Sequence, residues 1–570
     1  MLKLPPDVLV VICEELGNRR DFGTLFNCAL SSKSLVYPAL GWIYRIHNLC
    51  PIVSNEAFDP EFTSARKPTY NALLEEQRDT LSKWVLMWKS IIRSSLGTTA
   101  YPYCLYIRAL DLRNLADLLH DGMFYTTSAY NSFFRGEMTQ FSAHKDTPMK
   151  QKTRNNKKGA CVRFNVPGVL DRVGESITNF VFESAKENKY TAALEDISGH
   201  ISATALPIWT SRLSKLKSMT LWDGSALNEK LAVSMAQTCF YFDDLTFKAC
   251  LKNQDVDGRL ASFFNGLRAD TLRSFNALNA NSVGPETLLA LTHHAKSLKS
   301  LKFGGLKSEA IKSISNLQGC DTLECLEIVD ADGLINLEAT ENDVFIEMIE
   351  WLGRCDSLRD LQLTSLVSSP EILTQICPKD NIKLRSLVVH DYNLIGNSEF
   401  HRALAFQTSL ENLDLKADAD GAFRDDIDAL VDTLCTLSNL RCLKLISTSD
   451  YFTSSEIIRL ASWLHNLEDF WFGGYEITDR IWSKMSDLHN LRALNIVGIS
   501  TFSKTGIENY ITTLGEGNRG FDLQVMAQSS SHTISEEGRE DLQEHIRAKV
   551  GGRFGYTPHR EDSESEDFSD

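Results

Sequence analysis

Apolar residues recur through the C-terminal half of the chain with the spacing Leu-x-x-Leu-x-Leu. The middle apolar positions advance by 24 to 35 residues from Met219 to Leu494, and helical stretches such as residues 345–352 and 457–464 lie between copies. Each copy predicts a short strand, because alternate side chains share one face of a strand. The copies are Leu216-Met219-Leu221, Phe242-Leu245-Phe247, Leu272-Phe275-Ala277, Leu298-Leu301-Phe303, Leu323-Leu326-Ile328, Leu358-Leu361-Leu363, Leu384-Leu387-Val389, Leu410-Leu413-Leu415, Leu440-Leu443-Leu445, Leu467-Phe470-Phe472 and Leu491-Leu494-Ile496.

A strand followed by a helix at this period is the signature of leucine-rich repeats. One such unit cannot cover its own apolar face, whereas stacked units bury a continuous core. The pattern therefore predicts an α/β fold, a horseshoe solenoid with a parallel inner sheet and outer helices over residues 105–550. The first strands are expected at 107–112 and 177–182, the last strand near 521–525, and a capping helix at 535–549.

The first 50 residues have a different pattern, which predicts three short helices over residues 4–47. Val8, Leu9, Ile12 and Leu16 share one face of the first helix, and Leu25, Phe26, Ala29 and Leu30 recur in the second. A unit of this size buries little surface and is marginal alone. Its surplus of apolar side chains therefore indicates a partner.

The remaining segments fall outside both patterns. Residues 51–104 read as a linker loop and a long amphipathic helix from about 70 to 96. Residues 122–161 interrupt the first repeats and are expected to form a mobile insertion, with a basic stretch at 145–158. Residues 551–570 are Gly-rich, then acidic and Ser-rich, and are expected to form a disordered tail.

The N-terminal string LPPDVLVVICEEL, followed by CALSSKSLVYPALGWIYR, resembles the F-box motif. Many F-boxes have a Trp shortly after the central segment, where this chain has Leu35. The resemblance covers about 45 residues and implies an all-α unit that binds the Skp adaptor, and through it a cullin/RING ligase core. The residues that it would place at the adaptor are Leu4, Pro5, Val8, Leu9, Ile12, Leu16, Leu25, Cys28, Leu30 and Leu35. The alternative for this unit is a helical cap on the solenoid.

A substrate surface is expected on the concave face of the sheet. The residue between the last two apolar positions of each copy points away from the core, as does the residue after each strand. Most of these positions are polar, but Trp222 and Trp471 are aromatic, and aromatic side chains are favoured as binding anchors. Three tyrosines are expected in loops just beyond the strands. The candidate contacts are Trp222, His390, Tyr392, Asp414, Lys444, Tyr451, Trp471 and Tyr475.

Composition narrows the possible partners. The net charge of −16 makes nucleic acid an unlikely partner, because the field of the chain repels phosphates. No apolar stretch approaches the roughly 18–20 residues of a membrane span. Thirteen cysteines without a CxxC pair indicate reduced thiols, so we expect a cytoplasmic or nuclear protein.

No catalytic or metal-binding constellation is present in the sequence. The HExxH, GxSxG and P-loop motifs do not occur, so we expect no cofactor and no enzymatic activity. The F-box resemblance implies a non-catalytic, substrate-recognition subunit of an SCF-type ubiquitin ligase. The alternatives are a leucine-rich-repeat interaction scaffold outside any ligase, and a solenoid that activates a GTPase or inhibits an enzyme.

Overall fold

The computed structural model describes residues 4–49, 70–126, 128–142, 165–188, 194–250, 255–279, 281–418, 423–528 and 534–558. The chain divides into two compact units, Met1–Phe275 and Asn276–Asp570. Within the described residues, no helix has the length and apolarity that a membrane span requires.

The first unit begins with the three predicted helices, α1 (Pro6–Asn18), α2 (Phe22–Ser31) and α3 (Lys33–Arg45). Their boundaries follow from local chemistry. The Asp21 carboxylate accepts a hydrogen bond from Thr24 N at 3.0 Å and caps α2, and Ser32 caps α3. The core of these helices is small: Cys13, Leu25 and Ala39 are buried in it, with partly buried side chains packed around them.

The long helix α4 (Tyr70–Ser94) follows, and its apolar stripe lies in the core of the first unit. Trp88, Ile91 and Ile92 are fully buried. Its neighbours in sequence are β1 (Ala109–Asp111), α5 (Leu112–His120), α6 (Gly122–Thr126), α7 (Ala129–Phe133) and α8 (Val166–Glu187). The strands and helices that complete this unit are β2 (Asp196–Gly199), α9 (Leu206–Thr210), β3 (Ser218–Asp223), α10 (Glu229–Thr238), β4 (Asp244–Ala249), α11 (Val256–Gly266) and β5 (Ser274–Ala277).

The second unit consists of strands separated by helices, except that α14 and α15 follow one another and β13 directly follows β12. Its strands are β6 (Ser300–Leu306), β7 (Cys325–Asp330), β8 (Asp360–Thr364), β9 (Ser386–Asn393), β10 (Asn412–Asp418), β11 (Cys442–Ile446), β12 (Asp469–Phe472), β13 (Ile477–Thr478), β14 (Ala493–Thr501), β15 (Asp522–Gln528) and β16 (Arg553–Pro558). Its helices are α12 (Pro285–Leu291), α13 (Ser308–Ile311), α14 (Leu337–Thr340), α15 (Asn342–Arg354), α16 (Ser369–Ile376), α17 (Ser398–Ala403), α18 (Arg424–Leu434), α19 (Ser454–Trp463), α20 (Trp482–Met485), α21 (Lys504–Thr513) and α22 (Glu536–Val550).

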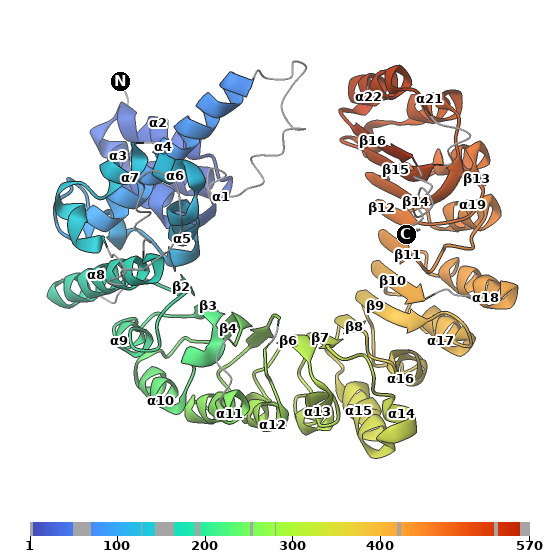
Figure 1. The fold of residues 1–570 in the computed structure, drawn as a ribbon, viewed down its shortest axis with the longest axis horizontal. Coiled ribbons are helices and arrows are strands. Elements are labelled where there is room, and N and C mark those ends of the chain that lie inside the picture. Colours follow the sequence, from blue (N-terminus) through green and yellow to red (C-terminus); the bar gives the residue numbers. More distant parts are fainter. Residues whose placement is uncertain are drawn as a thin grey trace, which may run out of the picture. The chain divides into compact units, whose positions relative to one another are not determined.

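The strands of the second unit form a parallel sheet in sequence order. Leu413 of β10 is in register with Leu387 of β9 and Leu443 of β11, and all three are fully buried. Helices cover one face of this sheet, and the opposite face, called the inner face below, carries no helix in Figure 1. The predicted leucine-rich-repeat fold is therefore confirmed by the register and by the burial of the repeated leucines.

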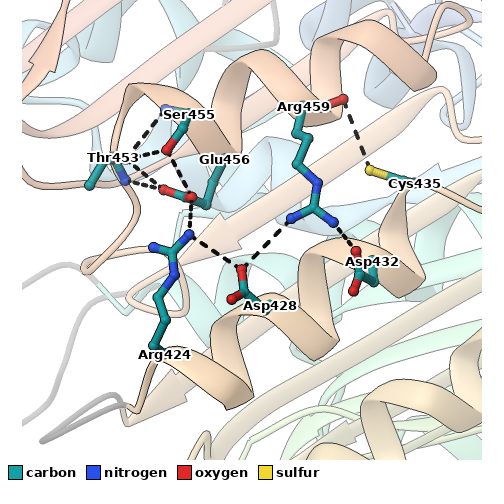
Figure 2. A network of polar contacts seen from close by, with 8 residues as sticks. All are labelled: Arg424, Asp428, Asp432, Cys435, Thr453, Ser455, Glu456 and Arg459. Carbon is teal, nitrogen blue, oxygen red and sulfur yellow. Dashed lines mark hydrogen bonds and ion pairs between the residues drawn. The ribbon is translucent and has the colours of Figure 1, made fainter.

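Ion pairs join neighbouring outer helices of the second unit (Figure 2). Arg424 at the start of α18 contacts Glu456 of α19 at 2.6 Å, and Arg459 of α19 contacts Asp428 at 3.7 Å and also Asp432. The Glu456 side chain is only 1% exposed. Burial alone would raise the pKa of Glu456, but hydrogen bonds from Arg424, Thr453 and Ser455 outweigh it and lower the pKa to about 2.

Three boundary predictions were wrong. Residues 177–182, expected as a strand, lie within α8. The Asn165 side chain caps this helix by accepting a hydrogen bond from Gly168 N. The strand of this repeat is β2. Residues 122–126 and 128–142, expected in a mobile insertion, form α6, α7 and a 3₁₀ turn that bury Phe124 and Phe133. Residues 553–558, expected in a disordered tail, form β16 beside β15, because their backbone completes the sheet ladder. The basic stretch at 145–158 and the acidic end of the tail lie outside the described residues.

Candidate protein-binding surfaces

The N-terminal helices expose an apolar surface that the small core leaves uncovered. Val8 and Ile12 lie one turn apart on α1, and Val11 lies beside them. Phe26 and Leu30 are likewise one turn apart on α2. All five are exposed, as is Leu4 just before α1, and Leu30 is 71% exposed. Solvated side chains of this kind are unusual in such density on a monomeric protein and mark an interaction surface.

The ten residues that the sequence assigned to the adaptor therefore divide into two groups. Leu4, Pro5, Val8, Ile12 and Leu30 are exposed, and Leu9 is half-buried. Leu16, Cys28 and Leu35 are partly buried against the core. Leu25 is fully buried in that core and cannot contact a partner, so its assignment was wrong. It faces inward because it lies on the side of α2 that packs with Cys13 of α1 and Ala39 of α3.

The opposite side of the N-terminal helices is anchored to the rest of the first unit. Tyr44 Oη of α3 is hydrogen-bonded to Ser90 Oγ of α4 at 2.7 Å, and its ring packs at a tilt of 32° against the Tyr103 ring. His47 is buried with its ring edge-on to Trp88, and burial lowers the pKa of His47. The apolar surface is therefore presented from a fixed support within this unit.

The repeats of the first unit place one candidate residue on their inner face. Trp222 is the penultimate residue of β3 and is 44% exposed. Lys248 of the adjacent strand β4 places its Nζ 3.9 Å from the centre of the indole ring. An ammonium group over an aromatic face is attractive, and it leaves the indole oriented for contact.

Most candidate residues of the second unit also lie on its inner face. His390 Nε2 of β9 is 2.9 Å from Asp414 Oδ1 of β10. Lys444 of β11 lies over the Trp471 ring of β12, with Nζ 4.8 Å from its centre, and Trp471 Nε1 donates to Asp469 Oδ1 at 2.6 Å. These contacts join neighbouring strands and orient the side chains before any partner binds.

The tyrosines beyond the strands behave differently from one another. Tyr451 and Tyr475 lie in loops after β11 and β12 and are exposed. Tyr392, which the sequence placed in an exposed loop, is only 2% exposed, and its hydroxyl is 3.2 Å from His401 Nε2, so this assignment was wrong. A bulge causes the difference: Lys416 and Ala417 are in register with His390 and Tyr392, so Asp391 is an extra residue with φ +60°.

Comparison with known proteins finds no matching family model and no matching curated protein. Among solved structures, an internalin (inlF) from Listeria monocytogenes is similar, at 14% identity and a TM-score of 0.32, over 58% of this chain and 83% of that chain. The Rad7 and Elc1 complex in yeast has 18% identity and a TM-score of 0.37, over 57% and 83%. A TLR13–ssRNA13 complex has 12% identity and a TM-score of 0.31, over 66% and 58%. The strand register, and not these similarities, establishes the fold.

Further exposed apolar residues lie beside the candidate aromatics. Ile446, Val497, Ile499 and Met526 are all exposed on or beside β11, β14 and β15. Val497 and Met526 occupy the position after each repeated triplet, which is the position that singles out Trp222 in β3. The alternation of side-chain direction along a strand could therefore have identified both residues from the sequence. Within the described residues, no group of His, Cys, Asp and Glu side chains has the geometry of a metal site.

Proposed function

We propose that this chain is the substrate-recognition subunit of an SCF-type cullin ubiquitin ligase. In this proposal α1–α3 bind a Skp adaptor, and the repeats bind a protein substrate in the cytoplasm or nucleus. The observation that carries it is the exposed apolar surface of α1 and α2, on a unit whose sequence resembles the F-box. The chain would supply proximity between substrate and ligase, and the chemistry would belong to the other subunits.

The energetics of the N-terminal surface support a permanent protein partner. Fully burying a Val, Leu, Ile or Phe side chain is worth about 1.5–3 kcal/mol. Val8, Ile12, Phe26 and Leu30 together would therefore supply a large part of the free energy of a stable complex, after the entropic cost of association. A unit with so small a core would also gain stability from the contact.

The repeats support the second half of the proposal. A solenoid of stacked repeats presents an extended surface whose side chains vary without affecting the leucine core. The inner face of the second unit carries oriented aromatic and charged side chains of this kind. A substrate held there would be a macromolecule, because the exposed residues extend across several strands and do not converge on one enclosed cavity.

The test is direct binding of the purified full chain to a purified Skp adaptor, measured by calorimetry. Ile12→Asp would place a charge in a desolvated contact, at a cost of several kcal/mol, so we expect at least a hundredfold loss of affinity. Val10→Asp is the matched control. Val10 is on the same helix and 46% exposed, against 39% for Ile12, but lies on the far side of it. We expect its affinity to stay within about twofold of wild type. Unchanged binding by Ile12→Asp would refute the proposal.

A second candidate function is an interaction scaffold that belongs to no ligase. It is favoured by the hydrogen bond between Tyr44 and Ser90 and by the packing of Tyr44 against Tyr103, because these contacts suit a helical cap that closes the first unit. A chain that binds no Skp adaptor, yet captures a protein through its repeats, would support this function instead.

A further inference from the structure

One row of the inner face in the last repeats is apolar. Ile446 of β11 and Val497 of β14 each follow a buried residue of the register, and Gly473 directly follows β12. Met526 of β15 is in register with Val497. Ile446, Val497 and Met526 are 36%, 46% and 39% exposed. In most other strands of the second unit the same row is polar, with Thr364, His390 and Lys416. The apolar row is therefore a local feature of the last repeats.

Gly473 stands in this row between Ile446 and Val497, is buried, and adds no side chain to it. A Cβ at this position would lie 2.8 Å from Asp450 Oδ1 and 3.2 Å from the Val497 carbonyl oxygen. The Gly473 amide donates to Ser449 Oγ at 2.6 Å, which holds the loop in place. A side chain at this position would have to displace Asp450, so the apolar side chains of the row are those of Ile446, Val497 and Met526.

Aromatic side chains border the row on both sides. Trp471 of β12 lies on the inner face two residues before Gly473. Its indole nitrogen donates to Asp469, and the Lys444 ammonium lies over its ring. Tyr475 is 54% exposed and follows the Gly473–Gly474 turn, and Ile499 N donates to Gly474 O at 3.0 Å, which brings β14 beside that turn. Exposed aromatic and aliphatic side chains from several strands thus form one patch, here called the C-terminal patch: Ile446, Trp471, Tyr475, Val497, Ile499 and Met526.

Carboxylates surround the C-terminal patch. Asp414, Asp469 and Asp522 lie on the inner face of β10, β12 and β15, and accept hydrogen bonds from an imidazole, an indole and the amide of Gln524, respectively. Burial raises the pKa of Asp469. The inner face between β9 and β16 carries five carboxylates and three cations. The carboxylates are Asp391, Asp414, Asp418, Asp469 and Asp522; the cations are Lys416, Lys444 and Arg553.

Lys416 and Lys444 make contacts on the inner face itself. Lys416 pairs with Asp391 at 3.1 Å, and Lys444 lies over the Trp471 ring. The arginines of the outer helices in the same repeats are also paired, Arg424 with Glu456 and Arg459 with Asp428 (Figure 2). The inner face of the last repeats is therefore both apolar and net negative, within a chain of net charge −16.

We propose that the C-terminal patch binds an extended polypeptide segment that combines aliphatic or aromatic side chains with lysine or arginine. The inference rests on the proposed function, since it names the class of substrate that the receptor takes. Apolar side chains of the segment cover Ile446, Val497 and Met526, while its cations face Asp414, Asp469 and Asp522. A long aliphatic stem that ends in a charge suits a surface with apolar centre and acidic border.

The test begins with a phage-displayed library of random twelve-residue peptides, selected on the immobilised full chain. We expect the enriched peptides to be basic and to carry at least two aliphatic or aromatic residues. The tightest peptide is then synthesised, and its affinity is measured by fluorescence polarisation at low and high salt, where higher salt should weaken binding. Enrichment of acidic peptides, or no enrichment above an empty support, would overturn the proposal.

A pair of variants separates the charge of the patch from its shape. Met526→Lys and Met526→Glu remove the same apolar side chain and introduce opposite charges at an exposed position. For a basic segment we expect Met526→Lys to weaken binding at least tenfold more than Met526→Glu. Equal losses, or the reverse order, contradict the proposed charge of the segment.

Two further measurements complete the design. Trp471→Ala should weaken the peptide at least tenfold, whereas Trp463→Ala, which removes an exposed indole from the outer helix α19, should leave it unchanged. Adaptor binding by each variant is measured in parallel. Loss of the peptide with the adaptor retained supports the C-terminal patch as the substrate surface. If the chain binds the peptide but not the adaptor, the proposed ligase function is refuted and the proposal for the C-terminal patch is not.

Discussion

Glu456 offers the sharpest test of how the outer helices of the second unit are held together. Its carboxylate accepts from Thr453 N and Thr453 Oγ1 at 2.7 Å, from Ser455 Oγ at 3.0 Å and from Arg424 at 2.6 Å. Together with Thr453 it forms the capping box of α19. Glu456→Gln keeps one acceptor oxygen and the shape of the side chain, but removes the charge.

The expected cost follows from the pKa. A value of about 2, against the ordinary 4.5, corresponds to about 3 kcal/mol at pH 7. Arg424 is 55% exposed, so solvent screens part of this interaction, and we expect about 2 kcal/mol. Asp432→Asn is the matched control, because Asp432 also pairs with an arginine but is 65% exposed. It should cost less than about 0.5 kcal/mol.

The assay is hydrogen exchange of the α19 amides, followed by mass spectrometry, because a repeat array opens locally and not as a whole. At pH 7, Glu456→Gln should speed exchange in residues 454–463 about thirtyfold, and Asp432→Asn less than about threefold. The folded pKa of Glu456 is lowered, so its stabilisation is complete above pH 4.5 and is lost as the pH falls toward 2. The difference in α19 exchange rate between wild type and Glu456→Gln should disappear over that pH range. Equal effects of the two variants at pH 7 would refute the argument from burial.

Three further predictions concern the core and the turns. Trp351→Ala removes a fully buried side chain whose Nε1 donates to Cys320 O at 3.1 Å, and should lower the free energy of unfolding by about 3–5 kcal/mol in thermal melts. Gly498→Ala would place a Cβ 2.4 Å from Gly474 N and should lower the melting temperature, whereas Gly515→Ala meets nothing within 4 Å and should not. Burial lowers the pKa of His401 to about 4, so protonation of His401 favours the unfolded state. The wild type should therefore lose stability relative to His401→Gln as the pH falls from 6.5 to 4. An equal fall in the melting temperatures of the two proteins over this range would contradict the prediction.

The spacing of leucines predicted the repeats because a strand with one buried face has a strict period of two. The prediction failed at residues where this period of two is absent. Residues 177–182 combine β-branched and aromatic side chains, as strands do, yet Val173, Ile177 and Val181 recur every four residues and are buried on one face of α8. The actual strand, β2, has only four residues and no leucine. Its pairing with β1 and β3 sets its conformation, and such tertiary contacts are not visible in a single sequence.

The candidate surfaces show the same limit at single residues. Leu25 and Phe26 are adjacent and both apolar, yet one is fully buried and the other is 56% exposed, because the packing angle of α2 against its neighbours decides which side faces inward. Similarly, the bulge at Asp391 reverses the alternation along β9 and turns Tyr392 into the core. Sequence pattern identified which residues could bind, and three-dimensional packing decided which of them are available.

The position of the C-terminal patch near the last strands has a kinetic consequence. In a linear stack each repeat is held only by its neighbours, so the final repeat, with β16 and α22, has a neighbour on one side and opens most often. Met526 lies on the strand next to β16. A segment bound across Val497 and Met526 would join β14 to β15 from the inner side and act as a clamp on that end of the stack. Binding at the patch would then slow amide exchange in α22, although this helix lies on the opposite face of the sheet from the patch.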